Sequence, residues 1–303
     1  MTTPPPAEAV AAALQASRIR IEALALTKPG ARPFARMLAR LAHLLAAPPR
    51  VVLLGEFNSG KSTLANALIG AEALPTSIHA NTRVPIHARF SSRPTLCVEF
   101  DGGRREPLTE LMLPQLQDGR VRMLHAGVVI PRLKLFELID TPGLQPGGAA
   151  GAGAGRADRL ALEACRRAHI AIWCTASTQA WKASEAQMWR LVPERLKSHS
   201  LLVATLSDAL NNDRDRFRVE ERLQAEAGPH FAAVILAAGA EVEALRADPN
   251  ARDHAERWTS CGGEAIDREL QALIDREKAD RTASVARVLA RIVGRIPKNL
   301  SGT

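Results

Sequence analysis

Nine consecutive residues, Gly55 to Thr63, have the types and spacing of a phosphate-binding loop. They read Gly-Glu-Phe-Asn-Ser-Gly-Lys-Ser-Thr and fit the pattern G-x-x-x-x-G-K-[ST]. Glycines let the backbone wrap around an anion, and successive N–H groups then point at phosphate oxygens. Lys61 supplies a charge for the β- and γ-phosphates, and the Ser62 hydroxyl is placed to ligate Mg²⁺. Nucleotide contacts are assigned to Gly55, Asn58, Ser59, Gly60, Lys61, Ser62 and Thr63.

The elements around this loop are those that such a loop requires. The apolar run Val51–Leu54 predicts a strand that leads in, and the spacing of Leu64, Leu68 and Ile69 predicts a helix that leads out. The N-terminus of that helix adds a partial positive charge to the anion site. A chance Gly-rich turn is the alternative, and it does not explain a strand before the loop and a helix after it.

Further candidate ligands lie downstream. Asp140-Thr141-Pro142-Gly143 follows a predicted strand, so the Asp140 carboxylate is placed to hold a Mg²⁺-bound water and the Gly143 N–H to sense the γ-phosphate. Thr82 lies in the irregular segment 71–85, where its hydroxyl would ligate Mg²⁺ and its backbone would orient the attacking water. The alternative for Thr82 is an ordinary polar loop residue.

Base recognition is expected after the predicted strand 200–206, at Thr205-Leu206-Ser207-Asp208. A carboxylate at Asp208 accepts from guanine N1–H and from its exocyclic amine, whereas adenine offers neither donor there. Leu206 stands where a lysine is usual, so its aliphatic body would cover the base without a charge. Ala237, after the last predicted strand, would let the backbone approach the base.

Together these residues resemble the bacterial members of the dynamin-like large GTPases. The resemblance is carried by Gly55 to Leu64, Leu74-Pro75-Thr76, Asn81-Thr82-Arg83-Val84-Pro85, Asp140 to Leu144, Ile172-Trp173, Gln179-Ala180-Trp181, Ser184-Glu185, and Thr205-x-x-Asp208 followed by Val219 and Arg222-Leu223. It covers about residues 50–240. The phosphate loop alone is generic, but the combined order and spacing is specific.

The resemblance implies GTP hydrolysis driven by dimerisation across the nucleotide, often with a monovalent cation (K⁺ or Na⁺), and coupling to membranes. Two features depart from the family: Leu206 breaks the guanine motif, and 303 residues are too few for the long helical stalk and membrane-binding tip. Leu144 also stands where small GTPases place a glutamine. Self-assembly into membrane coats is therefore not expected, and a stalk-bearing partner protein is one way to supply the missing part.

Catalysis is accordingly assigned to Lys61, Thr82, Asn58 and Gly143, with Ser62, Thr82 and Asp140 as metal ligands. Arg83 is a weaker candidate for stabilising developing charge. Slow basal turnover, raised by dimerisation, is the expectation. Two alternatives stay open: a GTP- or GDP-binding switch or scaffold with little hydrolysis, and relaxed specificity that extends to ATP.

The fold predicted is α/β, a P-loop GTPase fold with a mostly parallel sheet covered by helices on both faces. Residues 1–6 are expected to be a disordered tail, 50–260 the GTPase domain, and 7–49 and 261–303 flanking helices that form a small bundle. The predicted elements are strands at 50–55, 86–91, 95–100, 121–130, 133–139, 169–174, 200–206 and 231–236, and helices at 7–26, 33–46, 61–70, 107–117, 157–168, 181–196, 214–226 and 263–297. Gly147 to Gly155 contains only Gly and Ala and predicts a mobile loop.

Composition narrows the partners and the compartment. The net charge of +8 suits anionic partners, but seven Phe and no Tyr supply few stacking groups, so nucleic acid is not expected. The four cysteines are dispersed and predict buried, reduced thiols. Since no signal peptide or membrane-spanning run is recognised, a cytoplasmic location is expected. The amphipathic, basic flanking helices would allow peripheral binding to an anionic membrane, although packing of their apolar stripes on each other is favoured.

Overall fold

The computed structural model describes residues 6–71, 84–108, 120–145, 155–210 and 212–295. The chain divides into two compact units, Pro49–Ile274 and Met1–Pro48 together with Asp275–Thr303. Residues 1–5 of the predicted disordered tail, residues 147–154 of the Gly/Ala loop, the helix 107–117 beyond its first two residues, Thr82 and Arg83 lie outside the described residues. The domain limits given from the sequence stay predictions.

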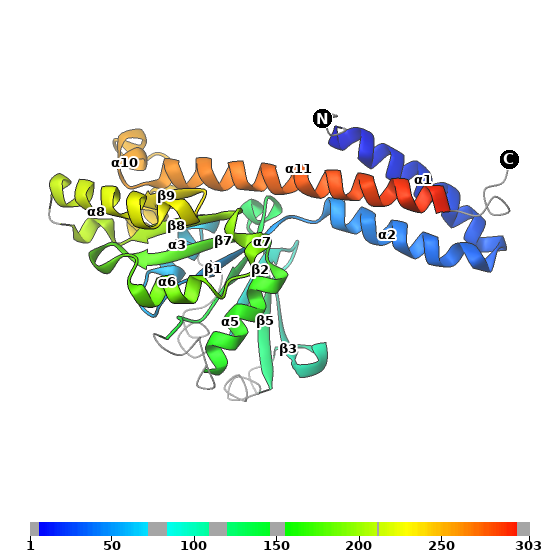
Figure 1. Cartoon of the computed structure of the whole chain (residues 1–303), viewed down its shortest axis with the longest axis horizontal. Helices are drawn as coiled ribbons and strands as arrows, with labels where there is room; N and C mark the ends of the chain where they lie inside the picture. The colour runs from blue at the N-terminus through cyan, green and yellow to red at the C-terminus, as the bar shows by residue number, and fades with distance from the viewer. Residues whose placement is uncertain (1–5, 72–83, 109–119, 146–154, 211, 296–303) are drawn as a thin grey trace. The chain divides into compact units, whose positions relative to one another are not determined.

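A nine-stranded sheet forms the centre of the larger unit in the described part of the chain (Figure 1). Its order is β4-β3-β5-β2-β6-β1-β7-β8-β9. The strands are β1 (Arg50–Leu54), β2 (Ile86–Phe90), β3 (Thr95–Phe100), β4 (Arg105–Pro107), β5 (Val121–Val128), β6 (Glu137–Asp140), β7 (Ile170–Ala176), β8 (Ser200–Thr205) and β9 (Ala233–Leu236). The run from β6 through β1, β7 and β8 to β9 is parallel, whereas β2 pairs antiparallel with β6, and β3 pairs antiparallel with both β4 and β5. The predicted mostly parallel α/β fold is thereby confirmed.

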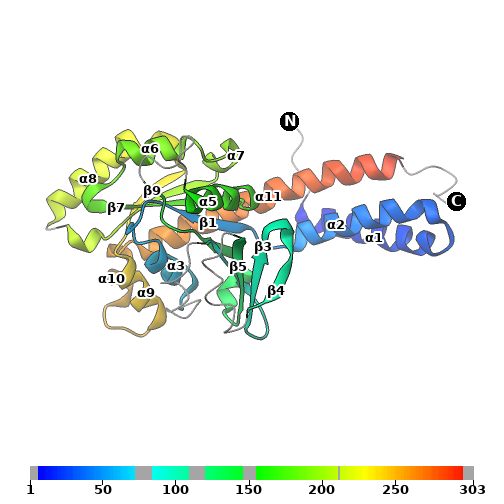
Figure 2. The same cartoon turned by 90° about the horizontal axis from the view of Figure 1, so that it is seen from below.

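Helices cover both faces of this sheet, as Figure 2 shows. In the larger unit they are α3 (Lys61–Ile69), α5 (Arg156–Arg167), α6 (Ala183–Trp189), α7 (Glu194–Lys197), α8 (Asp213–Glu226), α9 (Gly239–Ala247), α10 (His254–Ser260) and the first part of α11 (Gly263–Arg295). Alternate residues of β1 face opposite sides: Val52 packs in the cluster that includes α5 to α8, and Val51 in the cluster that includes α3 and α11. Burial on both faces explains why β1, β7 and β8 read as near-continuous apolar runs.

Three predicted elements differ from the structure. The helix expected at 181–196 is two short helices, α6 and α7, because Trp181 has a left-handed φ of 57° and Pro193 precedes α7. The strand expected at 133–139 begins only at Glu137, because Pro131–Lys134 forms a 3-10 turn. The helix expected at 107–117 does not begin at Pro107, because Pro107 is the last residue of strand β4.

The smaller unit is a bundle of α1 (Ala7–Thr27), α2 (Arg32–Ala46) and α11 from Asp275 onward. Apolar side chains from all three helices form one core: Val10, Leu14, Ile21, Leu38, Leu41, Val285, Leu289 and Ile292. Arg281, only 6% exposed, pairs with Glu277 at 3.0 Å and donates to the carbonyls of Leu44 and Ala47 at the end of α2. The apolar stripes of the flanking helices therefore pack on one another. Along the described part of the chain, every helix is too short or too polar to cross a membrane.

Candidate nucleotide-binding site

The phosphate loop joins the end of β1 to the start of α3, at the carboxyl edge of the parallel strands. Two of its glycines are required by backbone geometry. A Cβ on Gly55, whose φ is 144°, would lie 2.1 Å from the carbonyl oxygen of Cys174 on β7. Gly60 caps α3 with a left-handed φ of 72°, and a Cβ there would meet Thr205 Oγ1 at 2.8 Å. Only glycine lets the loop lie this close to β7 and β8.

Lys61 points back into the loop. Its Nζ donates to the carbonyl oxygens of Gly55 at 3.1 Å and Glu56 at 2.6 Å, and to Ser59 Oγ at 3.3 Å. The residue is 7% exposed, and this burial lowers the pKa of its ammonium although neighbouring anionic groups raise it. A buried ammonium beside backbone N–H groups fits a phosphate oligoanion.

The two described candidate metal ligands meet beside the loop. Ser62 Oγ, in the first turn of α3, donates to Asp140 Oδ2 over 3.4 Å. Asp140 ends β6, next to β1 in the sheet, where it is 9% exposed. A hydroxyl and a carboxylate are the oxygen ligands that Mg²⁺ takes alongside nucleotide phosphates, so this donor set fits the predicted metal. The other predicted ligand, Thr82, lies outside the described residues.

The segment after Asp140 crosses directly over the phosphate loop. A Cβ on Gly143 would lie 2.7 Å from Phe57 Cα, so a glycine is needed for this crossing. The Leu144 N–H donates to the Gly55 carbonyl at 3.0 Å, and the Leu144 side chain is 2% exposed within the apolar core. Leu144 therefore presents no polar side chain to a water at the γ-phosphate. Gln145, which the sequence reading did not single out, follows it and is exposed.

The predicted base-binding residues divide into two kinds. Asp208 is exposed just after β8, and Leu206 is 41% exposed with a left-handed φ of 55°. Thr205 is instead buried, and its Oγ1 contacts the Ser59 carbonyl at 2.8 Å. Ala237 is also buried, and its backbone bonds to Ala204 and Ser207. Asp208 and Leu206 are therefore exposed after β8, whereas the Thr205 hydroxyl bonds to the phosphate loop and the Ala237 backbone bonds to β8 and to the residue that follows Leu206.

The remaining predicted contacts lie on the same loop. Asn58 is exposed with a left-handed φ of 59°, Ser59 is buried, and Thr63 lies on α3 beside Gly239. Asn58 is therefore the loop side chain from this group that faces solvent at the anion site. The structure brings the phosphate-loop residues, Asp140 and Gly143 into one constellation.

Sequence reading missed one interaction at this site. Glu56, the second residue of the loop, is 6% exposed, and its carboxylate contacts Lys182 Nζ at 2.5 Å and Ser184 Oγ at 2.6 Å. The signal available in the sequence was an acidic residue inside a loop that binds a polyanion. Its partners are more than a hundred residues away, so spacing alone did not reveal them.

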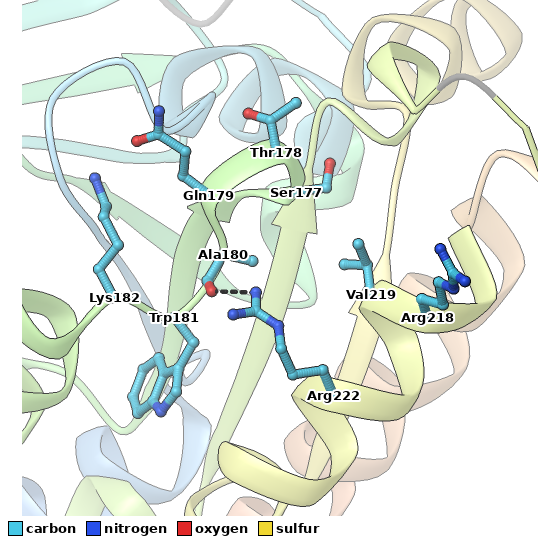
Figure 3. Close-up of a pocket in the computed structure, with 9 residues that line it drawn as sticks. All are labelled: Ser177, Thr178, Gln179, Ala180, Trp181, Lys182, Arg218, Val219 and Arg222. Atoms are coloured by element: carbon cyan, nitrogen blue, oxygen red, sulfur yellow. Dashed lines mark hydrogen bonds between the residues drawn. The ribbon is translucent and has the colours of Figure 1, made fainter. Parts of the chain in front are cut away.

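A separate pocket of about 500 Å³ lies between the segment after β7 and helix α8 (Figure 3). Arg222 on α8 donates to the Ala180 carbonyl at 2.7 Å and ties the two walls together. In Figure 3, Lys182 and Arg218 extend at opposite sides of this pocket.

The cysteines do not contribute to a site in the described residues. Cys165, Cys174 and Cys261 are buried and Cys97 is half-buried, all as free thiols. Burial raises the pKa of Cys165 and Cys174 to about 12, so both stay protonated. Across the described ranges, no three His, Cys, Asp or Glu side chains group in a way that would hold a metal ion.

Comparison with known proteins agrees with this geometry. A family model described as "50S ribosome-binding GTPase" matches residues 50–205, more than half of the 303 residues. The chain therefore belongs to this family of GTPases, whose members share the P-loop fold.

Within that class the chain is similar to bacterial dynamin-like proteins. It is 30% identical over 167 residues to "Dynamin-like protein 2" of Campylobacter jejuni (strain 81-176). The matched residues make up 53% of this chain and 26% of that protein. It is 33% identical over 113 residues to "Isoniazid-induced protein IniC" of Mycobacterium tuberculosis, covering 35% of this chain and 23% of that protein. The chain thus spans about a quarter of the length of these relatives.

A solved structure shows the same fold. The chain matches a structure reported as "An oligomerised bacterial dynamin pair provides a mechanism for the long range sensing and tethering of membranes" with a TM-score of 0.53 and 21% identity, over 80% of this chain and 38% of that one. The resemblance predicted from the motifs is confirmed.

Proposed function

We propose that this chain binds GTP and hydrolyses it to GDP and phosphate. The observation that carries the proposal is the meeting of Lys61, Ser62 and Asp140 at one phosphate loop, in a domain that belongs to a GTPase family. Asp208, exposed after β8, supplies the carboxylate that a guanine would need.

Different residues of the site are proposed to bind the phosphates, to hold Mg²⁺ and to orient the attacking water. Lys61 and the loop N–H groups bind the phosphates and stabilise the charge that develops as the γ-phosphate leaves. Ser62 and Asp140 would hold Mg²⁺, which neutralises phosphate charge when bound. The Gly143 backbone crosses the loop, where its N–H would sense the γ-phosphate. Thr82 would orient the attacking water, as assigned from the sequence.

The finer parts of the proposal rest on the resemblance. Nucleotide-dependent dimerisation would complete the site, with Asn58 near a monovalent cation, K⁺ or Na⁺. An anionic membrane or a stalk-bearing protein is the proposed partner, reached from a cytoplasmic or peripheral membrane location. The similar solved structure is of an oligomerised bacterial dynamin pair, which supports dimerisation by analogy.

The second candidate function is a nucleotide-binding switch or scaffold with little hydrolysis. The burial of Leu144 favours it, because no polar side chain at that position can polarise water. The position of Leu206 beside Asp208 likewise favours relaxed specificity, including for ATP.

The deciding experiment measures phosphate release from GTP and ATP by wild-type protein and by Lys61→Ala, over a range of protein concentrations and in KCl or choline chloride. We expect GTP turnover that rises with protein concentration and falls by about a hundredfold or more in Lys61→Ala. Equal rates for wild type and Lys61→Ala would sink the enzyme proposal. GTP binding without that difference would favour the switch.

A further inference from the structure

The acidic side chain of Glu56 stands inside a loop that, in the proposed function, binds a triphosphate. A carboxylate at this position repels the ligand, and its burial costs free energy unless it is paired. Both of its oxygens have partners: Oε2 contacts Lys182 Nζ at 2.5 Å, and Oε1 accepts from Ser184 Oγ at 2.6 Å. Glu56 in turn raises the pKa of the Lys182 ammonium. The carboxylate is therefore occupied by protein donors and turned away from a phosphate-binding role.

The backbone of the same residue reaches the lysine of the loop. The Glu56 carbonyl accepts from Lys61 Nζ at 2.6 Å and from the Ser59 N–H at 3.3 Å. A movement of Glu56 would thus displace the groups that orient Lys61. The side chain of Glu56 faces one segment of the protein, while its backbone shapes the anion site.

The segment that holds Glu56 is itself fixed. Glu185, 1% exposed, accepts from Trp173 Nε1 at 3.1 Å, from Thr175 Oγ1 at 2.9 Å and from the Lys182 N–H at 2.9 Å. These bonds anchor the start of α6 to β7. The donors that grip Glu56 therefore stand on a rigid support, which is what a positioning interaction requires.

We propose that Lys182 and Ser184 clamp Glu56 and thereby hold the phosphate loop and Lys61 in the geometry that binds nucleotide. Glu56, Lys182 and Ser184 are positioning residues, since they act through the loop and not on the nucleotide. This inference rests on the proposed function for its effect on GTP, but its effect on the order of the loop does not depend on that function.

The sign of one substitution separates the clamp from plain electrostatics. Glu56→Gln removes a negative charge from an anion site, so charge alone predicts tighter GTP binding. The clamp predicts weaker binding, because the loop loses a charge-assisted anchor. Lys182→Met should weaken binding by about tenfold, Lys182→Arg should restore most of it, and Lys182→Met should add little to Glu56→Gln.

The test combines GTP titration with hydrogen exchange of the peptide covering residues 55–61 in nucleotide-free protein. We expect about tenfold faster exchange in Glu56→Gln and Lys182→Met, with the melting temperature within a few degrees of wild type. Lys197→Met is the matched control, since it breaks the ion pair with Glu194 at 2.8 Å on α7 and should leave the loop unchanged.

Each outcome has one meaning. Unchanged exchange in both clamp variants, or tighter GTP binding by Glu56→Gln, would overturn the clamp. If the wild-type protein binds no GTP but Glu56→Gln and Lys182→Met still exchange faster in the loop, the clamp is upheld and the proposed function is refuted.

Discussion

Strands β1, β7 and β8 carry mostly buried apolar side chains. Strands β6, β2, β5 and β3 also carry a row of ionisable side chains, of which His125 and Glu99 are buried and Glu137 and His87 are half-buried. In the first group most residues belong to one of two apolar clusters, one on each face of the sheet. In the second group Glu137, His87, His125 and Glu99 stand on four neighbouring strands and bond in series. The residues proposed to bind nucleotide, Lys61, Ser62, Leu206 and Asp208, follow strands of the apolar group, and Asp140 ends β6 beside them.

The ionisable row is connected end to end. Glu137 Oε2 contacts His87 Nε2 at 2.9 Å, the two Nδ1 atoms of His87 and His125 lie 3.2 Å apart, and His125 Nε2 contacts Glu99 Oε2 at 2.7 Å. Glu99, 2% exposed, also pairs with Arg105 and Arg167.

The two groups of strands should therefore differ in how their stability depends on pH. Aliphatic side chains have no titratable proton, so the stabilisation from burying them should not change with pH in the moderate range. The strands of the ionisable row depend on which groups are charged, because a buried charge without its partner is costly.

Leu202 on β8 is fully buried in the apolar group. Leu202→Ala should lower the free energy of unfolding by about 2–5 kcal/mol, through lost transfer energy and the cavity left behind. The loss should be the same at pH 7 and at pH 5, measured by urea denaturation. A cost that changes with pH would remove the contrast between the two groups of strands.

The ionisable row should make the protein acid-sensitive. Burial, the largest effect, lowers the pKa of His125 from 6.5 to about 4, although its bond to Glu99 acts the other way; Arg105 and His87 lower it further. His125 is therefore protonated in the unfolded chain but neutral in the native state between these two pH values. The free energy of unfolding falls as pH falls from 6.5 to 4. The expected loss is about 3 kcal/mol, read from urea denaturation across that range.

Glu99 adds a separate loss at lower pH. Burial would raise the pKa of Glu99, but the hydrogen bonds from Arg167 and His125 lower it to about 2. Its contribution is present above pH 4.5 and is lost as pH falls toward 2.

His125→Gln should flatten the dependence of the free energy of unfolding on pH between pH 6.5 and 4, whereas substitution of the exposed His230 by Gln should not. An unaltered slope in His125→Gln would show that another group controls the acid response.

The smallest expected effect concerns the carboxyl edge of the apolar strands. Leu206→Lys should raise GTP affinity by about three- to tenfold over ATP, because an ammonium would then stand at the face of the base. Leu191, 40% exposed against 41% for Leu206, gives a matched control for an added charge. Equal gains in Leu191→Lys and Leu206→Lys would mean that net charge, and not contact with the base, sets the affinity.

Much of the fold and part of the site followed from local sequence. Strand β3 and the outline of α3 matched the prediction because their periodicity and glycines act over a few residues. Helix 181–196 failed because the left-handed Trp181 and the break before Pro193 override a helical pattern. The nucleotide contact assigned to Thr205 stays a prediction; the contact of its hydroxyl with the Ser59 carbonyl is one that no spacing in the sequence reveals.

The phosphate loop, the Asp140 motif, the family resemblance and the α/β class could be predicted from the sequence, since each is a pattern of residue types and spacings along the chain. Only the tertiary structure decided the antiparallel pairing of β2 with β6, the row from Glu137 to Glu99, and the pairing of Glu56 with Lys182 and Ser184. Strand order and long-range ion pairs arise when distant segments share one buried space. The free energy of a buried ion pair depends on how deeply its two groups are buried, and the residue types alone do not specify that burial.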